Sequence, residues 1–180
     1  MHISSFEQSN KKKIRGLKKK CRAMVEALIA QTSEFPIDYN SEEYWHYHLP
    51  VAQSFIDSKH TPQSVRRLCI QTMIDRTQFL SQHKPKNAKS CRVLCLVCLP
   101  DLWSSVITIF SSQNYFIHFF DRNNPWQRWT PLIHKDIAKE YNLIIPSNFQ
   151  VKSYKHECFD DDNPSIVTYV GEIWAIGELE

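Results

Sequence analysis

The spacing of apolar residues changes at a polar loop over residues 84–90, and this change is the strongest constraint on the fold. Before the loop, apolar side chains recur every three or four residues, which places them along one face of a helix. After it, residues 91–99 form a continuous run rich in Val, Leu and Cys that is too short to favour a helix. Helices that precede strands, without regular alternation, predict an α+β fold with an antiparallel sheet.

Two long amphipathic helices are predicted in the first half of the chain. The first spans about residues 11–33, where Ser9 or Asn10 can cap it. The second follows Thr61-Pro62, a favourable N-cap and first-turn pair. A short helix is expected over residues 50–57, and residues 36–50 are expected to be irregular.

The second half is predicted to be mainly sheet. A short helix is expected after Ser111 or Ser112, another over residues 134–142, and a loop is expected to carry Trp126 and Trp129. The sequence thus predicts two long N-terminal helices packed on a mainly antiparallel sheet of about four strands. These strands are predicted at residues 91–99, 105–110, 149–159 and 166–176.

The length of 180 residues fits one domain, predicted over residues 11–180 after a flexible tail at residues 1–10. The formal net charge is +3, but eight of the 22 Lys and Arg residues lie between Lys11 and Arg22. The rest of the chain carries 14 basic and 19 acidic residues, a balance of −5. The basic character therefore belongs to one segment and does not by itself indicate a nucleic-acid partner.

The residues before Lys11 are polar and lack the apolar core of a signal peptide, and no apolar run is long enough to span a membrane. Six cysteines without an export signal are typical of reduced thiols. We therefore expect a cytoplasmic protein with no membrane partner. Cys91, Cys95 and Cys98 have zinc-like spacing, but an extended strand points Cys98 away from the other two, so no metal is expected. No cofactor is predicted, because nucleotide-binding glycine motifs are missing.

The first candidate site is the aromatic cluster around Trp45, His46 and His48. If this stretch is extended, the two histidines share one face, where they can exchange protons or bind an anion, while Trp45 and Tyr47 pack inward. The alternative is that the aromatic rings anchor the segment and the histidines make ordinary surface hydrogen bonds.

The second candidate site combines planar Arg side chains with Trp faces suited to stacking. Such a cluster fits a ligand or a partner protein, and the alternative is a loop held by buried Trp side chains. Its candidate residues are Asp121, Arg122, Asn123, Trp126, Arg128 and Trp129.

The basic segment is a candidate for contacts with phosphates of nucleic acid, although no aromatic residues interleave with it. The alternative is a solvated outer helix face. Its residues are Lys11, Lys12, Lys13, Arg15, Lys18, Lys19, Lys20 and Arg22.

The chain also resembles a small bacterial domain-of-unknown-function family, family 3916, across nearly its whole length. This resemblance implies a single-domain bacterial cytosolic protein and supplies no catalytic residues. Some members of such small families resemble immunity partners of bacterial toxins, which is an analogy only. The segments that carry the resemblance are KKIRGL (12–17), YWHYHLPVAQ (44–53), SVRRLCIQTMIDR (64–76), FFDRNNPWQRW (119–129) and GEIWAIGEL (171–179).

No known catalytic signature is present, so the leading hypothesis is a binding or inhibitory protein that recognises another protein. The first alternative is an enzyme or small-ligand binder acting on an anionic substrate, with His46 and His48 as acid-base groups and Arg122 and Arg128 as clamps. The second alternative is nucleic-acid association through residues 11–22.

Overall fold

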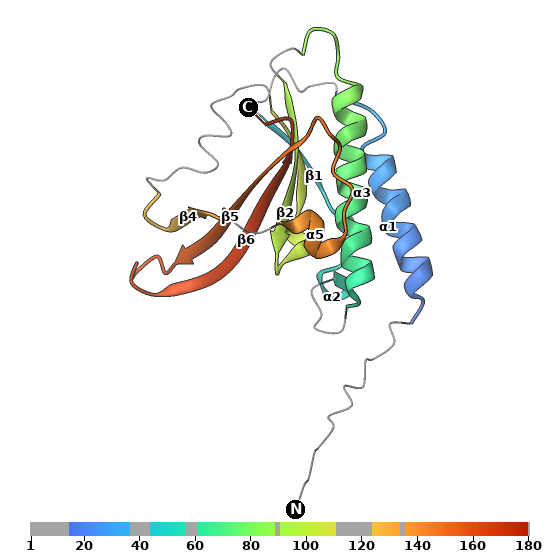
Figure 1. Ribbon diagram of the computed structural model, residues 1–180. Helices are drawn as coiled ribbons and strands as arrows, with labels where there is room; N and C mark the ends of the chain where they lie inside the picture. Colours follow the sequence, from blue (N-terminus) through green and yellow to red (C-terminus); the bar gives the residue numbers. More distant parts are fainter. Residues whose placement is uncertain are drawn as a thin grey trace, which may run out of the picture.

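The fold, taken from a computed structural model, is described for residues 15–36, 44–56, 61–88, 91–110, 124–133 and 136–179. Six antiparallel strands form one sheet in the order β1-β3-β2-β6-β5-β4, and α1 and α3 form a layer on one side of it (Figure 1). The side of the sheet toward these helices is called the helix side, and the opposite side the far side. The predicted α+β class is confirmed.

The helices are α1 (Leu17–Gln31), α2 (Gln53–Ile56), α3 (Gln63–Gln82), the 3-10 turn η1 (Leu102–Ser104) and α5 (Ile137–Tyr141). The strands are β1 (Tyr44–His48), β2 (Arg92–Leu99), β3 (Val106–Phe110), β4 (Gln127–Pro131), β5 (Gln150–Phe159) and β6 (Val167–Gly177).

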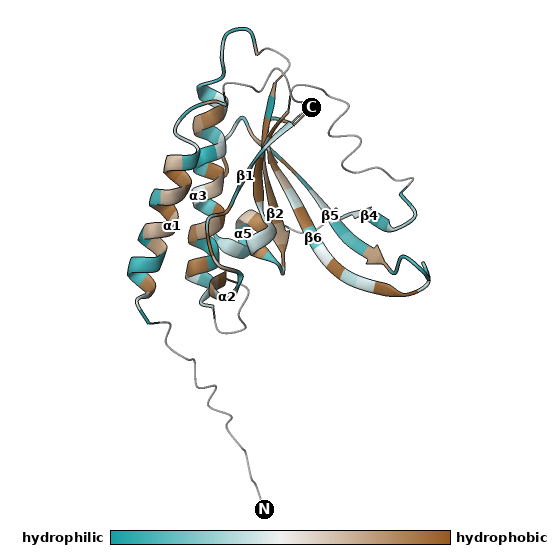
Figure 2. Cartoon of the chain, turned by 180° about the vertical axis from the view of Figure 1, so that it is seen from behind, coloured by the Kyte–Doolittle hydropathy of each residue, from teal (hydrophilic) through white to brown (hydrophobic). Residues whose placement is uncertain are grey.

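The main core lies between α3 and the helix side of the two central strands, β2 and β6. Cys95 and Val97 of β2 lie opposite Ile176 and Trp174 of β6, and all four side chains are buried. Because side chains alternate along a strand, Leu94 and Leu96 point to the far side, where they join a second, smaller cluster. Figure 2 shows hydrophobic residues along β2 and along the part of β6 nearest to it. The central strands are therefore buried on both sides.

Arg76 of α3 fixes the end of α1. Its Nε donates to Oγ1 of Thr32 at 3.0 Å, and its Nη2 donates to the Thr32 carbonyl oxygen at 2.8 Å. Thr32 is fully buried, and the guanidinium also lies 4.0 Å from the centre of the Phe79 ring. The two long helices are thus joined by polar contacts as well as by apolar packing.

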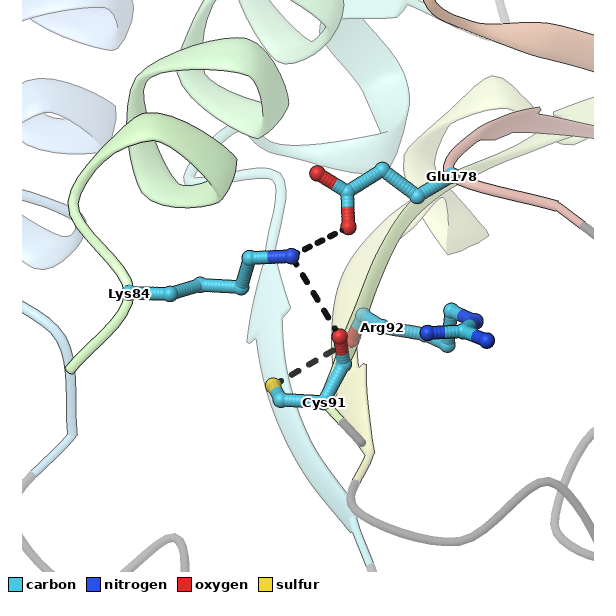
Figure 3. Close-up of polar contacts among 4 residues, drawn as sticks. All are labelled: Lys84, Cys91, Arg92 and Glu178. Atoms are coloured by element: carbon cyan, nitrogen blue, oxygen red, sulfur yellow. Dashed lines mark hydrogen bonds and ion pairs between the residues drawn. The ribbon is translucent and has the colours of Figure 1, made fainter. Parts of the chain in front are cut away.

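A second polar contact joins the end of β6 to the connection between α3 and β2 (Figure 3). Nζ of Lys84 donates to a carboxylate oxygen of Glu178 and, at 3.4 Å, to the carbonyl oxygen of Cys91. Burial raises the pKa of the Cys91 thiol to about 11, even though Lys84 nearby acts to lower it. This thiol is therefore protonated and serves as packing.

The outer parts of β5 and β6, together with β4, extend beyond the helix layer (Figure 1). We call this three-stranded extension the arm and define it as residues 127–131, 154–159 and 167–171. The helix α3 packs on β2, β3 and the inner part of β6. The strands of the arm are instead held by their pairing with one another.

The structure corrects the predicted strand number from about four to six. The two added strands are the edges: β1 lies in the segment predicted to be irregular, and β4 in the segment predicted to be a loop. The predicted positions of the other four strands, of α3 and of α5 are confirmed.

The first helix begins at Leu17 instead of residue 11, because Gly16 has φ 70° and a left-handed residue cannot continue a right-handed helix. Thr61 does not cap α3, since its hydroxyl donates to the Phe55 carbonyl at 2.8 Å. The predicted tail, the caps at Ser9 and Asn10 and the helix after Ser111 lie outside the described residues.

We predict that Gly177→Ala lowers the free energy of unfolding by about 3 kcal/mol, because a Cβ there would lie 2.3 Å from the Val93 carbonyl oxygen. The control is Gly16→Ala, whose Cβ has open space and meets only the left-handed backbone, a cost of about 1 kcal/mol. Urea denaturation measures both. Equal losses in the two variants would contradict the steric assignment.

We also predict that Arg76→Met destabilises the protein by about 2 kcal/mol, because the buried Thr32 carbonyl loses a charged donor while the aliphatic stem is kept over Phe79. Arg67→Met on the exposed face of the same helix should change stability by less than about 0.5 kcal/mol. Chemical denaturation of both variants checks this, and similar values for the two would show that the contact to Thr32 contributes little.

Candidate functional site

The first candidate cluster forms the edge strand β1. As predicted for an extended segment, Trp45 and Tyr47 pack against the core on the helix side. His46 and His48 lie on the far side with ring centres 6.2 Å apart, and Nδ1 of His46 lies 2.9 Å from Oγ1 of Thr108. Burial, and then the neighbouring His48, lower the pKa of His46, so its imidazole is neutral at pH 7.

The second candidate cluster forms the opposite edge strand, β4. Trp129 is half-buried within it, Arg128 is exposed, and Trp126 just before it is 40% exposed. Asp121, Arg122 and Asn123 lie outside the described residues.

The sheet order separates these two clusters. Five strand-to-strand steps lie between β1 and β4, about 24 Å along the sheet at about 4.8 Å per step. The structure therefore does not bring His46 and His48 into one pocket with Arg128. Each edge has to be considered by itself.

The helix side of the arm carries charged and apolar side chains. Glu157 of β5 accepts a hydrogen bond from Nζ of Lys155 at 2.7 Å and lies 3.9 Å from Nη1 of Arg128 across the strand pair. These two cations lower the pKa of Glu157. The Arg128 guanidinium also lies 5.0 Å from the centre of the Phe159 ring. Because Phe159 contacts this guanidinium, apolar and charged groups share this side.

The far side of the arm carries an aromatic stack that the sequence did not reveal. The rings of Trp129 and His156 are parallel within 5° with centres 3.9 Å apart, and Tyr169 meets His156 edge-on at 5.8 Å. Sγ of Cys158 lies 3.4 Å from Nε2 of the same histidine. The alternation of residues 154–158, with ring or thiol side chains at every second position, was the available signal.

The titration behaviour of this stack does not favour covalent catalysis. Burial lowers the pKa of His156 and raises the pKa of Cys158, so both groups are neutral near pH 7. A nucleophilic cysteine requires the opposite, a thiolate stabilised by a nearby cation. The pair instead forms a weak neutral hydrogen bond that packs the surface of the arm.

The three cysteines with the spacing of zinc ligands do not lie on one side of the sheet. Cys91 and Cys95 face the helix side and Cys98 the far side, as the alternation of β2 predicts. In the part of the chain that the structure describes, no three His, Cys, Asp or Glu side chains gather to hold a metal ion. Burial raises the pKa of Cys98 to about 12.

The basic segment contributes to the first turns of α1. Arg15, Lys18, Lys19 and Arg22 are exposed, and the spacing of the last three puts them on the outer side of α1. Nζ of Lys20 lies 5.6 Å from the centre of the Phe55 ring. Lys11, Lys12 and Lys13 lie outside the described residues, and none of the described helices is long and apolar enough to cross a membrane.

We predict that stability falls as the pH is lowered below about 6.5, the ordinary pKa of histidine, because the unfolded chain takes up a proton that folded His156 resists. His156→Phe keeps a ring for Trp129 to stack on and removes this titration, so its stability should depend less on pH. Urea midpoints between pH 5 and 8 test this. The same slope in both proteins would show that His156 does not contribute to it.

Comparison with known proteins agrees with the resemblance seen in the sequence. Residues 26–178 match the family described as Protein of unknown function (DUF3916). This range includes all six strands and α3, and it excludes the basic residues at the start of α1. No curated protein and no solved structure matches the chain. Since the match covers most of its length, the chain belongs to the DUF3916 family.

Proposed function

We propose that this protein binds another protein through its arm. The observation that carries the proposal is a group of apolar side chains exposed on and beside the arm although their strands are ordered. Folded proteins rarely expose such groups together, and where they do, the patch commonly binds a partner. These side chains are between 40% and 51% exposed and belong to Trp126, Ile166, Val167 and Val170.

The arrangement of charge supports a protein as the partner. Arg128, Glu157 and Lys155 lie beside the apolar residues and carry both signs of charge. Protein interfaces combine an apolar centre with a polar rim, and Trp and Arg are the residues most enriched at their energetic centres. The partner is expected to offer aliphatic side chains surrounded by charges of both signs.

The internal contacts of the arm also favour binding. The stack of Trp129 on His156 and the shared Glu157 hold side chains on both sides of the arm in fixed positions. A surface that is ordered before association loses less conformational entropy on binding. An inhibitory role, in which docking blocks the partner's activity, is the finer form of this proposal.

A photoreactive amino acid placed at Val167 tests the proposal in cells that produce the protein. We expect one discrete crosslinked adduct, because this side chain points outward from the arm. The matched control is Ile144, which is 73% exposed and follows α5, away from the arm. It should give no such adduct.

A second variant distinguishes specific docking from chance contact. Val167→Asp, combined with the probe at Val170, should reduce the yield of the adduct at least tenfold, because a charge in an apolar interface must be desolvated. Its urea midpoint should match that of the parent, since Val167 is exposed. Adducts of equal yield at Val167 and Ile144, or none at either, would overturn the proposal.

A further inference from the structure

A small pocket lies where the end of α1 meets the edge strand β1. Its volume is about 390 Å³, which falls within the range of small-molecule sites in proteins. One wall is formed by the residues that end α1 and follow it, and the other wall is formed by β1. We call it the β1 pocket, and the lining residues used below are Ser33, Glu34, Phe35, Pro36, Trp45 and Tyr47.

The lining of the β1 pocket is aromatic and acidic. Phe35, Trp45 and Tyr47 contribute three rings, Glu34 is acidic, and none of the described lining residues is Lys or Arg. A second pocket of about 400 Å³, between α3, α5 and the base of the arm, is lined instead by carboxylates and cations in equal number. The lining of the β1 pocket, in contrast, favours a ligand of positive charge.

Both walls of the β1 pocket are held by contacts within the fold. β1 pairs with β3, and Trp45 and Tyr47 pack against the core. The end of α1 is held by Arg76, which donates to the buried Thr32. Tyr47 joins the two walls, since its hydroxyl donates to the Glu34 carbonyl oxygen at 3.4 Å. The pocket therefore exists before any ligand binds.

The three rings suit a cation with an apolar surface. Aromatic rings attract cations because the face of each ring carries partial negative charge. The ring centres of Trp45 and Tyr47 lie 6.4 Å apart with their planes inclined at 55°, and Phe35 lines the same pocket from the other wall. Inclined rings around one space match a methylated ammonium group, which spreads its charge over methyl groups, better than a compact and strongly hydrated ammonium.

The charge of this part of the sequence also favours a cation. Residues 31–48 include four acidic residues, Glu34, Asp38, Glu42 and Glu43, and no Lys or Arg. Arg76 donates to Thr32, lies over the Phe79 ring and is not among the lining residues. The stretch is therefore acidic, unlike the basic start of α1, and attracts positive charge.

We infer that the β1 pocket binds a methylated ammonium group. Phe35, Trp45 and Tyr47 contact its methyl groups, and Glu34 supplies the opposite charge. Such a group occurs on small free cations and on methylated lysines of peptides, and both sources share this chemistry. β1 and β4 are opposite edges of the sheet, so the inference does not depend on the proposed contact through the arm.

Titration with choline, followed by amide proton and nitrogen chemical shifts, tests the inference. We expect saturable shifts at Ser33, Phe35 and Tyr47 and at the indole N–H of Trp45, which line the pocket. The neutral isostere of choline has a tert-butyl group in place of the trimethylammonium group. It should bind at least about tenfold more weakly, because the rings and Glu34 no longer attract a positive charge.

A glycine-flanked peptide with one trimethyllysine distinguishes the two sources of the cation. Tighter binding of this peptide than of choline assigns the pocket to a methylated lysine, and tighter binding of choline assigns it to a small free cation. The same peptide with unmodified lysine is the control, and it should bind more weakly than the trimethylated peptide because its ammonium is more strongly hydrated.

Two variants assign the effect to the lining. Glu34→Gln should weaken choline binding at least about threefold, because an exposed carboxylate is removed from beside the cation. The matched control is Glu26→Gln, which is exposed on α1 outside the lining and should leave binding unchanged. Trp45→Leu removes one ring and should weaken binding at least about tenfold, with an unaltered spectrum away from the pocket showing that it is folded.

Three results would each overturn the inference. The first is equal binding of choline and its neutral isostere, which requires no variant. The second is a Glu34→Gln variant that binds choline as the parent does. The third is the absence of saturable shifts with both choline and the trimethylated peptide up to about 50 mM, a limit that includes weak sites.

Discussion

The pairing of β2 with β6 beneath α3 is the interaction on which the rest of the structure depends. Val97 and Trp174 lie opposite each other on the helix side, while Leu96 and Ala175 are buried on the far side. Burial of each large apolar side chain contributes about 2 kcal/mol, so this central pair concentrates much of the hydrophobic stabilisation. The strands β3 and β1 attach through β2, and β5 and β4 attach through β6.

The arm exists because β5 and β6, in one half of this sheet, are longer than β3 and β1 in the other half. On one side of the centre, β3 and β1 have five residues each, whereas β5 and β6 have 10 and 11. At about 3.3 Å per residue the longer strands extend well past the ends of their neighbours. Residues beyond the helix layer gain no burial from it, so the arm depends on contacts within itself, of which the Trp129 and His156 stack is one. The same excess of length supplies both the surface proposed for a partner and one wall of the pocket at its base.

The sequence predicted the central helices and strands well, because burial in the core determines which of their positions must be apolar. The continuous apolar run of β2 and the helical spacing of α3 depend on contacts that require apolar residues. The two edge strands were missed for the opposite reason. Each is five residues long and buries one side at most. β1 carries two His among its aromatic residues, and β4 carries Gln and Arg beside its single Trp, so neither has an apolar run. The alternation of Trp45 and Tyr47 with His46 and His48 was nonetheless visible, and the structure confirms it.

The candidate sites, too, could be predicted from the sequence only in part. Trp129 and Arg128 were recognised as unusual from their types alone, but their partners His156 and Glu157 lie on another strand. Only the register between β4 and β5 brings them together, and register is a property of the whole sheet. Arg66 gave no signal, because an Arg on an amphipathic helix is ordinarily solvated. The turn at Pro100 and α5, which lie far from it in sequence, form a pocket with it.

The strand order also constrains how the protein is made. β6 is translated after the other five strands, yet it lies between β2 and β5 and is the element that joins the two halves of the sheet. During synthesis the β1-β3-β2 unit emerges from the ribosome early and exposes the edge of β2, a row of unpaired backbone groups flanked by buried-type side chains. That edge is covered only when residues up to Gly177 have left the exit tunnel. The nascent chain thus carries an open, apolar strand edge from the completion of β3 until β6 emerges, and this is the stage at which a chaperone would protect it.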